Sequence, residues 1–225
     1  MAKETAKIAA LKHPARMEPM MPREGERELE DLAVELVAKA SALAGRVNPT
    51  LQRSIGVLVR SMNCYYSNLI EGHDTHPRDI DRALAKDYAT EPRRRALQLE
   101  AVAHIEVQKH IDEDQDEKGD PASTQYILWL HREFCGRLPE ELLWVEDPDT
   151  HRRIRVRPGV MRDGDVAVGR HVPPSAAALA DFMAHFEQAY GSGHLSRLRQ
   201  ILAATAAHHR LVWIHPAGER AGLCH

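Results

Sequence analysis

The sequence predicts an all-α protein with one β-hairpin. Apolar side chains recur at steps of three and four residues through several long segments, which is the spacing of one face of an α-helix. Period-two alternation, which is typical of a strand, is confined to residues 152–171. We therefore expect a helical core to which a single hairpin is attached.

Composition and charge exclude several classes of function. Of the 225 residues, 43% are hydrophobic and 28% are charged, which is typical of a chain that buries a sizeable core. The 30 basic and 33 acidic residues nearly balance, so no overall field favours nucleic acid or an anionic membrane. No stretch resembles a signal peptide or a membrane span. We expect a cytoplasmic protein with no membrane partner and no nucleic-acid partner.

The cysteines and histidines do not predict a metal or disulfide framework. Cys64, Cys135 and Cys224 are widely spaced and form no Cys-x-x-Cys pair, so we expect reduced thiols that lie mostly in the core. The 14 histidines show no His-x-x-x-His arrangement with an acidic partner. Histidine clusters that bind a structural metal are therefore not expected.

The N-terminal half should begin with an arm and continue as helices. Residues 1–23 lack periodicity and contain three prolines, so we expect a mobile arm. Helical spacing starts at Glu24 and continues to Gly45, which is a residue type typical of helix ends. Together with the segments that follow, it gives an N-terminal helical region over residues 24–111.

Three more helices are expected in this region. The first opens after Asn48, with Pro49 in its first turn, and ends at Gly72. Another starts near Pro77, and the last runs from about Pro92 to Ile111. The charged stretch 112–121 then predicts a solvated loop that separates the two halves of the chain.

The second half, residues 121–225, combines helices with the hairpin. A helix is expected from Ser123 to about Leu138, followed by a hairpin that pairs the two ends of residues 152–171. After two prolines, Ser175 can cap a helix that runs to about Tyr190, and Ser196 opens the last one. This last helix ends in Ile-His-Pro at residues 214–216.

Three motifs along the chain bear on function. His215 stands at the end of a helix, and imidazole titrates near neutral pH, although a lone His-Pro is more typical of a capping residue. The stretch "YYSNLIEG" at residues 65–72 and the segment "GRHVPP" that follows the hairpin are the other two.

Together these motifs resemble the Fic family, in the family's order and over residues 31–216. The resemblance implies a Fic fold, a helical core with a β-hairpin flap, and transfer of AMP from ATP to a hydroxyl on a target protein. His215 matches the family's catalytic histidine, which accepts the proton of the attacking hydroxyl. Ser67, Glu71 and Gly72 match the inhibitory motif of the subgroup whose inhibitory helix precedes the core.

The resemblance also implies cofactors and a partner. ATP and Mg²⁺ are the expected cofactors, with Glu219 as the metal ligand and Glu219, Arg220 and Gly222 as cofactor-binding residues. The flap of the family pairs with an extended segment of the target protein through backbone hydrogen bonds. In this chain the matching flap residues are Arg155, Val156, Arg157, Gly169 and His171.

The catalytic loop departs from the family pattern His-Pro-Phe-x-[Asp/Glu]-Gly-Asn-Gly-Arg. Ala217 replaces phenylalanine, Arg220 replaces glycine, Ala221 replaces asparagine and Leu223 replaces arginine. The sequence printed ends at His225, before the pattern's second arginine and the helix that should support the loop. We therefore expect a truncated Fic core over residues 121–225, with little or no transferase activity and with Glu71 lacking its arginine partner.

Other functions stay open at this point. The main alternative is a non-catalytic protein-binding scaffold of the Fic type, which holds a partner on the flap and the N-terminal helices. A second is a chain that folds poorly because the apolar residues of 198–214 stay uncovered. A helix-turn-helix DNA reader is a third, with the basic run at residues 93–95 as its only local candidate.

Overall fold

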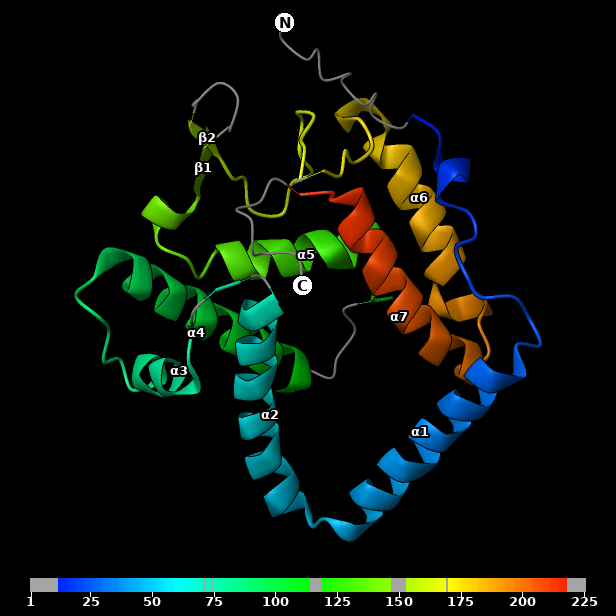
Figure 1. The fold of residues 1–225 in the computed structure, drawn as a ribbon, viewed down its shortest axis with the longest axis horizontal. Helices are drawn as coiled ribbons and strands as arrows, with labels where there is room; N and C mark the ends of the chain where they lie inside the picture. The colour runs from blue at the N-terminus through cyan, green and yellow to red at the C-terminus, as the bar shows by residue number, and fades with distance from the viewer. Residues whose placement is uncertain are drawn as a thin grey trace, which may run out of the picture.

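A computed structural model describes residues 12–70, 72–73, 75–113, 119–146, 153–168 and 170–217. Helices dominate this part of the chain, so the predicted all-α class is confirmed (Figure 1). The α-helices are α1 (Arg27–Arg46), α2 (Pro49–Ile70), α3 (Pro77–Leu84), α4 (Pro92–Glu113), α5 (Thr124–Cys135), α6 (Leu179–Tyr190) and α7 (Arg197–Ile214). Among the residues described, no helix is both long enough and apolar enough to cross a membrane.

Most helices start where the sequence predicts, because polar side chains satisfy the first backbone N–H groups. The Asn48 Oδ1 atom accepts from the N–H groups of Thr50 and Leu51, at 2.9 and 3.0 Å. Ser123 and Ser196 cap α5 and α7 in the same way. These caps explain why the boundaries of α2, α5 and α7 can be predicted from local sequence.

The predicted start of α6 at Ser175 is wrong. A short 3-10 helix, Ala176–Ala178, precedes α6, and the Ser175 side chain makes no capping hydrogen bond. Instead, the Asp165 carboxylate accepts from the Ala176 N–H at 2.7 Å. The cap therefore comes from a residue eleven positions before Ala176, which local sequence patterns do not detect.

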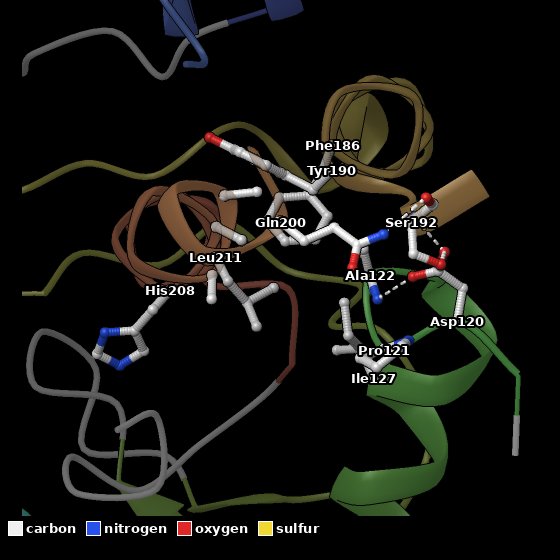
Figure 2. Close-up of a pocket in the computed structure, with 13 residues that line it drawn as sticks. Asp120, Pro121, Ala122, Ile127, Phe186, Tyr190, Ser192, Gln200, His208 and Leu211 are labelled. Carbon is white, nitrogen blue, oxygen red and sulfur yellow. Dashed lines mark hydrogen bonds between the residues drawn. The ribbon is translucent and has the colours of Figure 1, made fainter. Parts of the chain in front are cut away.

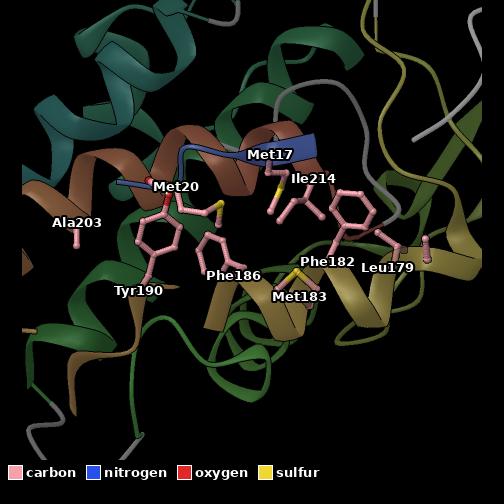
Figure 3. Packing of buried hydrophobic residues seen from close by; sticks show 10 residues of the cluster. Met17, Met20, Leu179, Phe182, Met183, Phe186, Tyr190, Ala203 and Ile214 are labelled. Carbon is pink, nitrogen blue, oxygen red and sulfur yellow. Dashed lines mark hydrogen bonds between the residues drawn. The ribbon is translucent and has the colours of Figure 1, made fainter. Parts of the chain in front are cut away.

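The largest core cluster lies between α6 and α7. Phe182, Met183 and Phe186 point from α6 toward α7 and are at most 2% exposed. From α7 the small Ala203 and the fully buried Ile214 meet them (Figure 3). Because alanine lets the helix backbones approach closely, α7 is held firmly along the length that leads to His215.

The chain before α1 completes this core, so the expectation of a mobile arm is wrong for residues 12–23. Met17 and Met20 are 1% and 6% exposed and pack into the cluster of α6 and α7 (Figure 3). The Tyr190 hydroxyl donates to the Met20 carbonyl oxygen at 2.6 Å, and the Arg210 guanidinium donates to the Pro19 carbonyl oxygen at 2.7 Å. Prolines remove the helical pattern here, but they do not prevent the methionines from packing.

Two smaller clusters flank α4. Ala101 and Ile105 pack with Cys64 of α2 and Ile80 of α3, whereas Ala103 packs with residues of α5 and the segment after it. Burial raises the pKa of the Cys64 thiol to about 12, so this cysteine stays protonated. Cys64 and Cys135 are free and buried, as predicted.

The apolar faces of α1 and α2 are largely exposed. Figure 1 shows these two helices forming a V, with the turn that joins them at its apex and their other ends near α7 and α4. Only Ala33 of α1 and Cys64 of α2 are buried. The exposed apolar side chains are Leu32, Val34, Leu36, Val37, Leu43, Leu51, Ile55, Val57, Leu58, Val59, Tyr66, Leu69 and Ile70.

The hairpin is present, but its pairing differs from the prediction. Strand β2 (Arg153–Arg155) pairs antiparallel with β1 (Trp144–Glu146), which lies before residue 152. Val156 extends this pairing, since its N–H donates to the Leu143 carbonyl oxygen at 2.8 Å. The far end of the predicted hairpin forms only a narrow bridge between Val168 and His171. Alternation identified the strand residues but could not identify their partner.

Replacement of Met17 by alanine tests the N-terminal segment. We expect Met17→Ala to lower the free energy of unfolding by about 2–4 kcal/mol, because it removes a fully buried side chain and leaves a cavity. Urea unfolding followed by circular dichroism measures the change. Arg16→Ala, at an exposed neighbouring position, is the matched control. Equal stability of the two variants would contradict the packing described.

Candidate functional site

The site is centred on His215, which ends α7 in a left-handed conformation. Its φ and ψ angles are 51° and 63°, and its N–H donates to the Leu211 carbonyl oxygen at 3.0 Å. A non-glycine residue in this region carries a cost of about 1 kcal/mol or more. The surrounding structure must therefore hold this turn, and the strain directs attention to the His215 side chain.

Arg162 holds the turn from the flap side. Its side chain is buried, and its Nε atom donates to the His215 carbonyl oxygen at 2.8 Å. Its Nη2 atom donates to the carbonyl oxygens of Pro174 and, at 3.5 Å, Ile214. Sequence reasoning missed this residue, because an arginine in a polar loop carries no local signal of burial.

The backbone joins the same two segments. The Arg162 N–H donates to the Pro216 carbonyl oxygen at 2.9 Å, and Met161 forms an antiparallel bridge with Ala217. Ala217 is 4% exposed. The first residues of the predicted catalytic loop are thus fixed to the chain that follows β2.

His171, which was predicted to belong to the target-docking flap, lies beside the end of α7. Its Nε2 atom lies 2.8 Å from the Trp213 carbonyl oxygen, and its ring stacks at 5.3 Å from the Trp213 indole. Trp213 in turn contacts Phe182 of the main core. The structure therefore brings two predicted residues, His171 and His215, to the same end of α7.

The electrostatics of the site favour a neutral His215 imidazole. Burial, and to a smaller extent the charges of Arg162 and His171, together lower the pKa of His215 to about 4. A neutral imidazole carries a lone pair on one ring nitrogen, and this lone pair can accept a proton. This is the protonation state that a general base requires.

A pocket of about 380 Å³ lies along α7 before His215 (Figure 2). Its walls come from the start of α5, the end of α6 and the face of α7 that includes Gln200 and Leu211. At one rim Asp120 accepts hydrogen bonds from Ser192 and from the Ala122 N–H. The lining is mainly apolar, and Leu211 links the pocket to the His215 turn.

The inhibitory motif lies at the C-terminal end of α2. Ser67 is half-buried in the last turn, and Gly72 follows the helix with a φ of 73°. The N–H of Gly72 donates to the Leu69 carbonyl oxygen at 3.1 Å. Glu71, the residue that matters most in this motif, lies outside the described residues. The helix predicted to carry the motif is confirmed, and the role of its residues stays a prediction.

The remaining predicted residues are exposed, buried or outside the described part of the chain. Arg155 and Arg157 are exposed and pair with Glu140 and Asp163, at 2.9 and 2.7 Å. Val156 is buried among the residues packed on α4 and α5, so its side chain cannot contact a partner. Gly169 and the cofactor-binding residues Glu219, Arg220 and Gly222 lie outside the described residues.

Comparison with known proteins finds a family match for the second half of this chain. Residues 121–216 match the model of the Fic/DOC family. These residues include Arg162, His171 and His215, so the part of the chain that holds the His215 site is similar to the Fic family.

Among similar proteins are the protein adenylyltransferases Fic of Drosophila erecta and Drosophila virilis. Each is 38% identical over 90 residues, which is 40% of this chain. The matched part spans only 15% and 16% of those two proteins, so their activities as whole proteins do not pass directly to this chain.

The protonation of His215 is measurable. In nuclear magnetic resonance spectra of histidine-labelled protein, we expect the His215 ring to titrate near pH 4 rather than at the ordinary value of about 6.5. Because the folded pKa is the lower one, the unfolded chain binds more protons between these values. This group therefore reduces stability as the pH falls from about 6.5 toward 4.

The variant His215→Gln assigns the signal and should reduce this pH dependence of stability. His209→Gln, at an exposed position of the same helix, controls for the loss of one histidine. A His215 titration at the ordinary histidine value would show that the ring is not buried as described.

Proposed function

We propose that His215 is the general base of an AMP-transfer site. The hydroxyl oxygen of a serine, threonine or tyrosine on a target protein would bond to the α-phosphorus of ATP, and pyrophosphate would leave as its bond to that phosphorus breaks. His215 would take the hydroxyl proton. The observation that carries this proposal is the neutral imidazole at the strained end of α7, within the segment that matches the family.

The flap is proposed to receive the target. β2 is exposed along its length, and Ile154 is 50% exposed on the strand. A two-stranded sheet has edges with free backbone groups, to which an extended segment can add by hydrogen bonding. Arg155 and Arg157 flank this strand with ion pairs to exposed acidic residues, which add little stability and exchange easily for contacts with a partner.

The chain has some, but not all, of the residues with which the family pattern binds ATP and Mg²⁺. Among the residues that the structure describes, no group of three or more histidine, cysteine or acidic side chains could hold a metal ion. Glu219 has the oxygen ligands that Mg²⁺ prefers, and bound Mg²⁺ would neutralise phosphate charge. Glycines let backbone N–H groups face a phosphate, but Arg220 and Ala221 replace Gly-Asn of the family pattern. The chain thus retains the base and one metal ligand but has an altered phosphate loop.

We therefore propose that AMP transfer by this chain is weak or absent. A second function, binding of a target protein without catalysis, is favoured by the same altered loop together with the exposed flap. Binding of a target protein without catalysis needs no phosphate site. The inhibitory role of Ser67, Glu71 and Gly72 is proposed on the motif and on the position of Ser67 at the end of α2.

Labelling with ATP that carries a radioactive α-phosphate tests the proposed AMP transfer and its impairment. We expect little or no label on this chain or on added cell proteins, because the substituted loop cannot hold the phosphates well. In the variant with Ala217→Phe, Arg220→Gly, Ala221→Asn and Leu223→Arg, labelling should rise and should be lost again with His215→Ala. Strong transfer by the unmodified chain that depends on His215 would overturn the proposed impairment.

A further inference from the structure

Arg162 has an unusual environment for a charged side chain. It is 7% exposed, and the acceptors on its guanidinium are backbone carbonyl oxygens of Gly164, Pro174, Ile214 and His215. Neutral carbonyl groups do not cancel a full charge. Burial lowers the pKa of this arginine, whereas the charge of Asp165 acts in the opposite direction. Burial of a cation is costly, so the hydrogen bonds that hold Arg162 in this place need an explanation.

The carbonyl oxygens that Arg162 binds are those that a helix leaves unsatisfied at its C-terminal end. They also carry the negative end of the helix dipole, which favours a cation. Ile214 is the last residue of α7, and His215 is its C-cap. Arg162, from a distant segment, therefore donates the hydrogen bonds that satisfy these carbonyl oxygens. At many helix ends a glycine in the left-handed conformation lets backbone N–H groups do this instead.

We propose that Arg162 is a positioning residue that sets the direction of the His215 side chain by holding its carbonyl group in the left-handed turn. This inference rests on the proposed role of His215 as the base. The direction of the Cα–Cβ bond follows from the backbone angles, so a turn that opens would move the imidazole. The planar guanidinium donates along several fixed directions at once, which a lysine ammonium on a flexible stem cannot reproduce.

The same side chain connects the base to the flap. Two of its acceptors, Gly164 and Pro174, lie on the segment between β2 and α6, and its own N–H holds Pro216. If the docking of a target displaces this segment, Arg162 would therefore shift the His215 turn as well. His171, from the same segment, also lowers the pKa of His215 through its charge, as Arg162 does.

The experiment compares Arg162→Lys with Arg170→Lys, an exposed arginine of the same segment. Both substitutions keep the charge, so they isolate the geometry of the hydrogen bonds. With Arg162→Lys we expect the His215 titration midpoint to rise from about 4 toward the ordinary histidine value, because the freed ring gains water. The His215 amide signal should also move, while Arg170→Lys leaves both unchanged.

An unchanged His215 midpoint in a folded Arg162→Lys protein would overturn the proposal, whatever its effect on thermal stability. A second measurement needs no variant, in case Arg162→Lys does not fold. In the unmodified chain the Arg162 Nε–H group should exchange with water about tenfold more slowly than that of Arg170, because opening its site costs free energy. Equal exchange rates would also overturn the proposal.

These measurements do not depend on catalysis. They use neither ATP nor a target protein, so they test whether Arg162 holds His215 even if no AMP transfer is found. Conversely, failure of the labelling experiment with the restored loop would count against the proposed function and leave the positioning of His215 intact.

Discussion

The contact between the Arg162 guanidinium and the C-terminal carbonyl groups of α7 is the constraint on which the site depends. It allows a helix to end in a left-handed histidine, and it fixes the next residues to the flap segment. Met161, the neighbour of Arg162, packs against the core that α6, α7 and the chain before α1 form. Met17 and Ile214 belong to this one core cluster, which supports the end of α7 where His215 lies.

The molecule separates into a well-packed site and a poorly covered N-terminal surface. Around His215, apolar and hydrogen-bonding contacts come from three distant parts of the chain. Along α1 and α2, most of the apolar side chains remain exposed. Stability is therefore concentrated where the site lies, since burial of apolar area is the main source of folding free energy.

The relation to the Fic family changes how the loop substitutions are understood. A base and a phosphate-binding loop make separate contributions to phosphoryl transfer, one by accepting a proton and one by holding charge. In this chain the surroundings of His215 favour a neutral imidazole, whereas residues 217, 220, 221 and 223 differ from the family pattern.

Local sequence alone determined the helical class, the starts of α2, α5 and α7, and the place of His215 at a helix end, because helix periodicity and capping act within a few residues. Only the tertiary structure decided the rest. The partner of β2, the cap that Asp165 supplies to the Ala176 N–H, the burial of Met17 and the role of Arg162 all arise from contacts between segments distant in sequence. Such contacts depend on how helices pack, and a single sequence carries no periodic signal of that packing.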